Sequence, residues 1–467
     1  MRGVLLVLTF LIVATGCNDG SSSGGAGGEA GVGGDGGTSA NGGTGGQGFS
    51  VTVIGALGAP VVDAPAMYAT SDGTHLLTLM TDANGEATFT NVPPGGFITA
   101  PVIQNQEVVS LQTVGGIGDG DTIELRATTA EEVPIGSFSI ATSLLSYGTV
   151  NYNVFVPSEQ FSSPDGLKRV FPPEPPQTPE DPGNLTASTI GPSGFFNAVG
   201  IANINTGRVE IGWATDLPLV GAPPMQTANG SITNWSAPTG VIEAGIMNVS
   251  GSAFSVSIRV RGYHDTRPYQ TKNFNNDVPN GQTFKAPLAQ STSFNDRAIA
   301  IFEASEAANG VSFKTQRIVA SEVSSGNTIL TTSTADFLPE PSGATRDIDA
   351  RLSEYGWTPT PTCDGVPINA SLLSFSGELV EKSYSWTMLA PYSDIVTMPE
   401  LDPNLADALF PDGIIEETWT LEARGYVDSD YETVRQTKPA LLTPEQLLGR
   451  QEGSQEVCVA TASAGVP

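Results

Sequence analysis

Along most of this chain, apolar and polar residues alternate at every second position, which is the pattern of a strand with one buried face. The clearest run is 254–263 (FSVSIRVRGY), where four apolar residues alternate with two serines, Arg259 and Arg261. It predicts a half-buried antiparallel strand. Similar runs recur from residue 49 onward between clusters of Gly, Pro, Asn and Asp, which make turns. We predict a mainly β chain of several antiparallel β-sandwich domains in tandem.

A hairpin is the most specific local prediction. In residues 81–97 (TDANGEATFTNVPPGGF), Asn84-Gly85 fits a tight turn because both residues tolerate positive φ. After this turn Ala87 and Phe89 share one face, and polar residues share the other. The paired prolines and glycines that follow end the strand.

The C-terminal part combines strands with short helices. Trp386 and Trp419 each alternate with polar residues and share a strand face with other apolar residues, which favours core packing over an exposed sugar platform. Residues 402–410 begin with Asp-Pro, and Thr443 and Gln446 have capping-box spacing at the start of 443–450. We predict a few short helices near the C-terminus.

Pro-rich stretches suggest where the folded part divides. We predict a small sandwich over 49–128, a β-sandwich domain over 129–338 with a Pro-rich loop at 171–183, and a C-terminal β-rich domain over 339–467.

The N-terminus has the pattern of an export signal. An apolar run of eleven residues, 4–14, follows Arg2 and is too short to cross a bilayer as a permanent helix. Small residues lead from it to Cys17. Residues 18–48 then contain 15 glycines in 31 positions and cannot bury enough surface to fold, so we expect a disordered tether.

The sequence Ala14-Thr15-Gly16-Cys17 resembles the lipobox of bacterial lipoproteins, although that family usually has Leu where Ala14 stands. The resemblance implies a signal peptide over 1–16, cleavage after Gly16 and a lipid on Cys17, which anchors the chain to a membrane. Asn18 after the cysteine favours the outer over the inner membrane in this family. The alternative is an ordinary secretory signal with an incidental cysteine.

The hairpin belongs to a second resemblance. Thr81-Asp82, Gly85, Phe89 and Pro94-Gly95 are similar to the hairpin and turn of the carboxypeptidase regulatory-like, or transthyretin-like, repeat family. The resemblance covers about residues 49–127 and implies a β-sandwich module that serves beside other domains.

The net charge of the chain restricts the kinds of molecule it is expected to bind. The chain has 49 Asp and Glu against 20 Lys and Arg, a formal charge of −29. Such a surface repels phosphate backbones, so nucleic acid is not an expected partner. A cationic patch over Arg259, Arg261, His264 and Arg267 is either an anion-binding site or the outer face of a strand.

The cysteine count is odd. In an exported chain, lipidation of Cys17 leaves Cys363 and Cys458 to form a disulfide. The alternative is two buried thiols.

Catalytic and metal motifs are scarce. With two histidines and no HExxH or Cys-x-x-Cys, a His- or Cys-based zinc site is nearly excluded, and we predict no cofactor. The stretch 115–121 (GGIGDGD) and the pairs Asp347/Asp349 and Asp428/Asp430 are either calcium ligands or turns and strand ends.

Two functional hypotheses remain. The first is a non-enzymatic envelope lipoprotein that displays β-sandwich domains for binding or structure, with an envelope protein or glycan as partner. The second is an extracytoplasmic hydrolase that acts on glycans through a pair of acidic residues.

Overall fold

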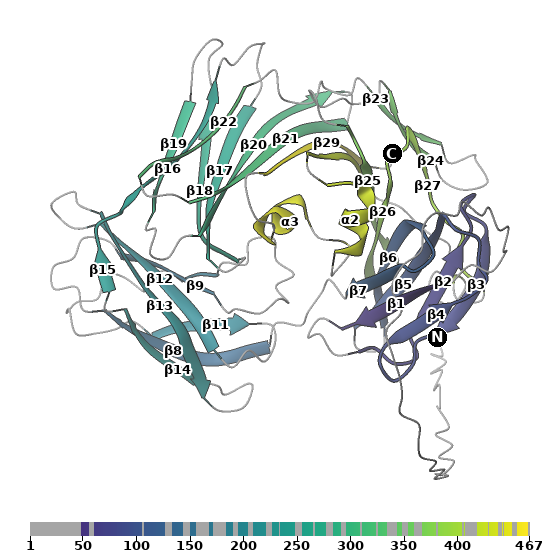
Figure 1. Ribbon diagram of the computed structural model, residues 1–467, viewed down its shortest axis with the longest axis horizontal. Coiled ribbons are helices and arrows are strands. Elements are labelled where there is room, and N and C mark those ends of the chain that lie inside the picture. The colour runs from purple at the N-terminus through teal and green to yellow at the C-terminus, as the bar shows by residue number, and fades with distance from the viewer. Residues whose placement is uncertain are drawn as a thin grey trace, which may run out of the picture. The chain divides into compact units, whose positions relative to one another are not determined.

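The computed structural model in Figure 1 describes the following residues: 48–55, 60–104, 107–126, 133–142, 150–155, 168–170, 184–189, 195–203, 209–220, 227–232, 234–247, 255–264, 267–276, 284–290, 296–308, 311–323, 326–333, 343–347, 354–358, 367–379, 382–403, 406, 418–427, 429–437, 441, 443–450 and 455–465. The predicted signal peptide, the tether up to residue 47 and the Pro-rich loop 171–183 lie outside these residues. The described part is mainly β, as the alternation predicts.

Seven strands occupy the first folded range. They are β1 (Phe49–Ile54), β2 (Pro65–Ala69), β3 (His75–Met80), β4 (Glu86–Phe89), β5 (Gly96–Gln104), β6 (Glu107–Ile117) and β7 (Thr122–Arg126). The order β4-β1-β7 forms one layer, and β6-β5-β2-β3 forms the other. Val51, Tyr68, Phe89 and Ile98 are buried between the layers.

The predicted hairpin turn is present. Gly85 has φ +73°, and the carboxylate of Asp82 accepts the amides of Asn84 and Glu86 at 2.8 and 2.9 Å. Phe89 is buried and packs against Phe49. Only Gly85 of the predicted Asn-Gly pair has positive φ, so the glycine alone supplies the special backbone conformation.

The middle of the chain contributes two further sheets. One follows the order β10-β9-β12-β13-β14-β8-β11, with β15 paired to β13, and the other follows β19-β16-β22. Their bounds are β8 (Val133–Thr142), β9 (Val150–Phe155), β10 (Lys168–Val170), β11 (Asn184–Thr189), β12 (Phe195–Asn203), β13 (Val209–Val220), β14 (Thr227–Ile232), β15 (Asn234–Ser236), β16 (Gly240–Met247), β19 (Phe284–Gln290) and β22 (Thr328–Ser333).

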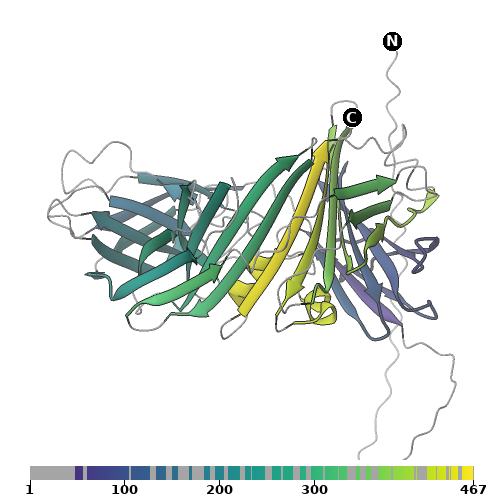
Figure 2. The same cartoon turned by 90° about the horizontal axis from the view of Figure 1, so that it is seen from above.

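The largest sheet has twelve strands in the order β18-β17-β20-β21-β29-β28-β25-β26-β6-β5-β2-β3. Figure 2 shows its long central strands side by side in green and yellow. The strands not yet given are β17 (Ser255–His264), β18 (Arg267–Asn276), β20 (Arg297–Ala308), β21 (Val311–Glu322), β25 (Ala370–Leu379), β26 (Lys382–Pro391), β28 (Thr418–Tyr426) and β29 (Gln455–Gly465).

This sheet crosses both predicted domain boundaries. β26 and β6 pair in parallel, residues 385–389 against 110–114, and every other pairing along the sheet is antiparallel. At this junction the indole N–H of Trp386 donates to Thr113 Oγ1 at 2.8 Å. The three folded ranges therefore share hydrogen-bonded strands, and their division into domains stays a prediction.

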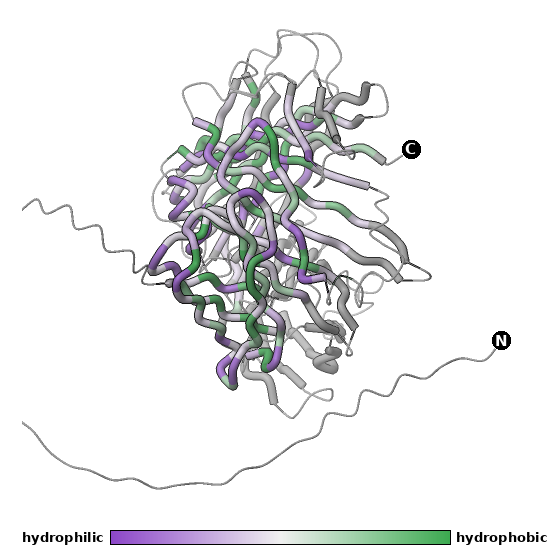
Figure 3. The backbone as a smooth tube through the Cα atoms, turned by 90° about the vertical axis from the view of Figure 1, so that its right-hand side faces the viewer, coloured by the Kyte–Doolittle hydropathy of each residue, from purple (hydrophilic) through white to green (hydrophobic). Residues whose placement is uncertain are grey.

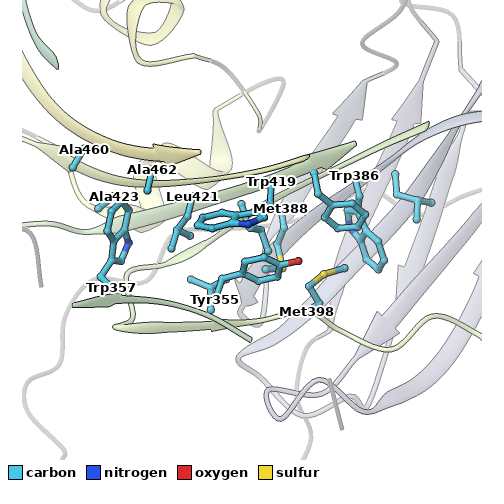
Figure 4. Close-up of a cluster of buried hydrophobic side chains, with 14 of the residues drawn as sticks. Tyr355, Trp357, Trp386, Met388, Met398, Trp419, Leu421, Ala423, Ala460 and Ala462 are labelled. Atoms are coloured by element: carbon cyan, nitrogen blue, oxygen red, sulfur yellow. The ribbon is translucent and has the colours of Figure 1, made fainter. Parts of the chain in front are cut away.

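Both faces of the large sheet carry other elements over its C-terminal strands. On one face, Trp419 and Leu421 pack against Tyr355 and Trp357 of a small sheet, β23 (Gly343–Asp347), β24 (Glu354–Thr358) and β27 (Ile395–Thr397), as Figure 4 shows. Trp357, Trp386 and Trp419 are buried, so these three belong to the core, as predicted for the latter two.

The opposite face carries two short helices, α2 (Tyr431–Gln436) and α3 (Pro444–Arg450). Leu447 and Leu448 of α3 are buried against Val457 and Val459 of β29. α3 confirms the helix predicted at 443–450, whereas α2 was not predicted. In the predicted helix 402–410, Pro403 and Ala406 are helical, and the rest of its interior lies outside the described residues.

Candidate functional site

The predicted cationic patch is where the structure departs most from the sequence pattern. Arg261 is fully buried on β17, and its Nη1 lies 2.5 Å from Glu445 Oε1 of α3. Arg259 on the same strand is half-buried. The prediction of a half-buried strand with Arg261 on its outer face is therefore wrong, because α3 covers that face while Ile258 and Val260 fill a second core.

Tyr263 completes this contact. Its hydroxyl donates to Glu445 Oε1 at 2.7 Å, so one carboxylate oxygen accepts from both side chains. Burial, and then the negative charge of Glu445, raise the pKa of Tyr263 well above its ordinary value, so the phenol stays protonated. A Cβ at Gly449 would lie 2.7 Å from the Tyr263 ring, so the absence of a side chain there lets α3 approach.

Arg297 lies beside this cluster, directly across β17 and β20 from Tyr263. Its side chain is 5% exposed, and neither Nε nor Nη2 has a hydrogen-bond partner within the described part of the chain. Burial lowers the pKa of Arg297, and the charges of Glu322 and Asp296 oppose that shift. The cluster is thus a buried polar core whose carboxylate holds α3 on the sheet.

The other two members of the predicted patch are placed only by their backbone. His264 ends β17 and Arg267 begins β18, where the two are register partners, and their side chains lie outside the described residues. An anion site formed by all four residues stays a prediction. Arg261 already pairs with the carboxylate of Glu445.

α2 makes the second buried ion pair, which the sequence did not suggest. Arg435 Nη2 lies 2.8 Å from Asp121 Oδ2, and its Nη1 donates to the carbonyl of Gly116. Asp121 also accepts the amide of Gly118 at 2.6 Å and Gln436 Nε2 at 3.0 Å. Within the stretch 115–121, residues 115–117 therefore end β6, and residues 118–121 form a turn whose last aspartate binds α2. Of the other acidic pairs, Asp430 caps α2 through the amide of Thr433 at 2.8 Å.

A third polar contact lies at the start of β3. Thr78 Oγ1 donates to Asp402 Oδ2 at 2.7 Å, and His75 Nε2 lies 3.0 Å from the same hydroxyl. The hydroxyl has one proton and directs it to Asp402, so His75 Nε2 must be the donor to Thr78. This arrangement cannot activate Thr78 through His75, and it attaches the segment around Asp402 to β3.

Of the three cysteines, the structure describes Cys458 alone. It is buried on β29, where Arg317 Nη1 donates to its Sγ at 3.2 Å. Gly16, Cys17 and Cys363 lie outside the described residues, so the lipid anchor and the pairing of Cys363 with Cys458 stay predictions.

The described residues contain no group of three or more His, Cys, Asp or Glu side chains arranged to hold a metal ion. Neither described helix approaches the length and hydrophobicity needed to cross a bilayer.

Comparisons with known protein families and with curated proteins give no match. Among solved structures, the Bacillus anthracis TIE protein is 14% identical, covering 62% of this chain and 50% of its own, with a TM-score of 0.15. A Streptococcal ancillary pilin is 9% identical, with coverages of 61% and 98% and a TM-score of 0.15. The pilus adhesin SpaC from Lactobacillus rhamnosus GG is 10% identical, with coverages of 74% and 44% and a TM-score of 0.14. This chain spans about half the length of the TIE protein, and at these TM-scores the matches support no argument about its role.

Proposed function

We propose that this chain is a lipid-anchored protein of the bacterial cell envelope whose folded part has a non-catalytic binding or structural role. The signal pattern ending at Cys17 supports the anchor, and Asn18 favours the outer membrane. The Gly-rich stretch that follows would hold the folded part away from the lipid surface at a typical span of about 30 Å.

Two buried ion pairs support the structural role. Arg261–Glu445 and Arg435–Asp121 each join a helix to a strand or turn far away in the sequence. Together with the twelve-stranded sheet, these pairs bind the two ends of the folded chain into one framework. Charged groups committed to internal pairs serve rigidity, which a display or assembly protein needs.

Membrane fractionation of Cys17→Ser tests the anchor. The wild-type protein should remain in the membrane pellet after a high-salt wash and should incorporate labelled fatty acid, whereas Cys17→Ser should do neither. Cys363→Ser is the matched control, because it removes a cysteine outside the lipobox and should pellet like wild type. A Cys17→Ser variant that still pellets after the wash would contradict the anchor.

Crosslinking in intact envelopes tests the binding role. The wild-type protein should capture a defined envelope protein or glycan, and the same species should be lost when the chain is released from the membrane. Capture of no reproducible species would favour a structural role in the envelope.

A further inference from the structure

β3 ends the twelve-stranded sheet. Its residues His75–Met80 pair with β2 on one side, and among the strands that the structure describes β3 is the last in the hydrogen-bonded order. A terminal strand presents a row of backbone N–H and C=O groups with which another strand can pair. β3 lies at the right of Figure 1 and toward the viewer in Figure 3.

The side chains of this edge are unusually apolar. Leu76 is 51% exposed and Met80 is 54% exposed, while Leu77 and Leu79 pack against the sandwich core. The strand HLLTLM contains no lysine, proline or inward-pointing charge, the devices by which edge strands usually prevent pairing. From outside the sandwich, the described residues contact this strand at two positions: the amide of His75 donates to Glu400 at 3.2 Å, and the side chain of Thr78 donates to Asp402 at 2.7 Å.

Exposed carboxylates stand at both ends of the strand. Asp72 precedes it by three residues, and Asp82 follows it by two. Hydrogen bonds from the backbone amides of Glu86 and Asn84 lower the pKa of Asp82, so this group is ionised at neutral pH. Residues 49–127 as a whole contain eight Asp and Glu against a single arginine and no lysine.

We propose that β3 accepts an extended segment of a partner protein as an additional strand. The segment would be apolar in its middle, to cover Leu76 and Met80, and would carry lysine or arginine at its ends, to meet Asp72 and Asp82. A second copy of β3 does not fit this position, because its carboxylates would face those of the first copy. The proposal rests on the binding role proposed above and names the chemistry of the partner.

Peptide binding tests this edge directly. The probe is a fluorescent ten-residue peptide of alternating valine and lysine, titrated against the protein purified in detergent with its own N-terminus and followed by anisotropy. We expect it to bind at least about tenfold more tightly than the matching valine–glutamate peptide, and to weaken as salt rises. Equal affinity for the two peptides would overturn the proposal.

Three variants locate the binding surface. Leu76→Lys and Met80→Lys each remove an apolar contact and add a repelling charge, so each should weaken binding by about tenfold or more. Val62→Lys is the matched control, since Val62 is also 51% exposed in the same sandwich but lies outside β3, and it changes the net charge equally. Binding that falls as much in Val62→Lys as in Leu76→Lys would show general charge attraction and contradict the proposal.

Hydrogen exchange gives a second readout that does not depend on the variants. The lysine peptide should slow exchange of amides in β3 and leave those of β1 and β7 unchanged. Protection elsewhere with none in β3 would overturn the edge assignment. Neither the peptide titration nor hydrogen exchange depends on Cys17. If β3 does not bind the peptide, the membrane anchor can therefore still be correct, and membrane fractionation tests it separately.

Discussion

α2 and α3 are each held against the rest of the fold by a buried ion pair, but the two helices contribute opposite charges. α3 brings a carboxylate, Glu445, to an arginine buried in the sheet. α2 brings a guanidinium, Arg435, to an aspartate buried in the turn after β6. Both helices have seven residues or fewer and would be marginal alone, so each depends on its buried contact for its place in the fold.

Within the described residues, the two contacts use their carboxylates differently. Asp121 accepts from Arg435, Gln436 and the amide of Gly118, and Arg435 also reaches a backbone carbonyl. In contrast, a single oxygen of Glu445 accepts from both Arg261 and Tyr263. When its carboxylate is lost, Arg435 keeps the carbonyl of Gly116 as an acceptor, whereas both contacts described at α3 end on the same oxygen of Glu445, so we expect the larger loss of stability at α3.

Glu445→Gln should therefore have the largest effect. It keeps the shape of the side chain but removes the negative charge that Arg261 and Tyr263 share, and breaking a buried ion pair in this way costs about 3–5 kcal/mol of the free energy of unfolding. Denaturation by urea measures the change. Glu432→Gln on α2 is the control, since that side chain is 67% exposed and should change stability by less than about 0.5 kcal/mol. A Glu445→Gln variant as stable as this control would remove the distinction between the helices.

Asp121→Asn should have the second largest effect. Arg435 keeps the carbonyl of Gly116, so we expect a loss of about 2–3 kcal/mol, smaller than at Glu445. Asp119→Asn is the control, because Asp119 is exposed in the same turn. Urea denaturation and hydrogen exchange of the α2 amides report the change, and a loss greater than that of Glu445→Gln would reverse the order proposed for the two contacts.

Tyr263→Phe should have the smallest effect at neutral pH, about 1–2 kcal/mol, because it removes one hydrogen bond. Its pH dependence is more informative. The pKa of Tyr263 is raised in the folded state, so its contribution is complete below about pH 10, the unfolded value, and is lost as pH rises toward the folded value.

The urea midpoint measured from pH 8 to pH 11 tests this sign. Wild type should lose more stability than Tyr263→Phe over the alkaline part of the range, with the remaining loss shared by Tyr426 and Tyr431, whose pKa values burial also raises. Identical alkaline slopes for the two proteins would show that Tyr263 does not titrate with folding.

Local pattern predicted much of the secondary structure. Phe89 and Trp386 lie on the buried faces that alternation assigns to them, and Gly85 occupies the turn. α3 was visible from its capping residues. α2 was missed because its six residues show no apolar periodicity, although Asp430, which caps it, was a usable signal.

The long-range contacts were not predictable in the same way. Nothing local in β17 marks Arg261 as buried, because the element that covers it, α3, follows about 180 residues later. The parallel pairing of β26 with β6 likewise depends on which strand edges meet in the folded chain.

Local sequence patterns therefore specify the mainly β class, the turn at Gly85 and the inward faces of single strands, because side-chain alternation and backbone preference act over a few residues. The tertiary structure alone decided that the twelve-stranded sheet runs across the predicted domain boundaries, that Arg261 is buried with Glu445, and that β3 is left at the edge. These outcomes follow from contacts between residues far apart in the chain, whose partners no local pattern specifies.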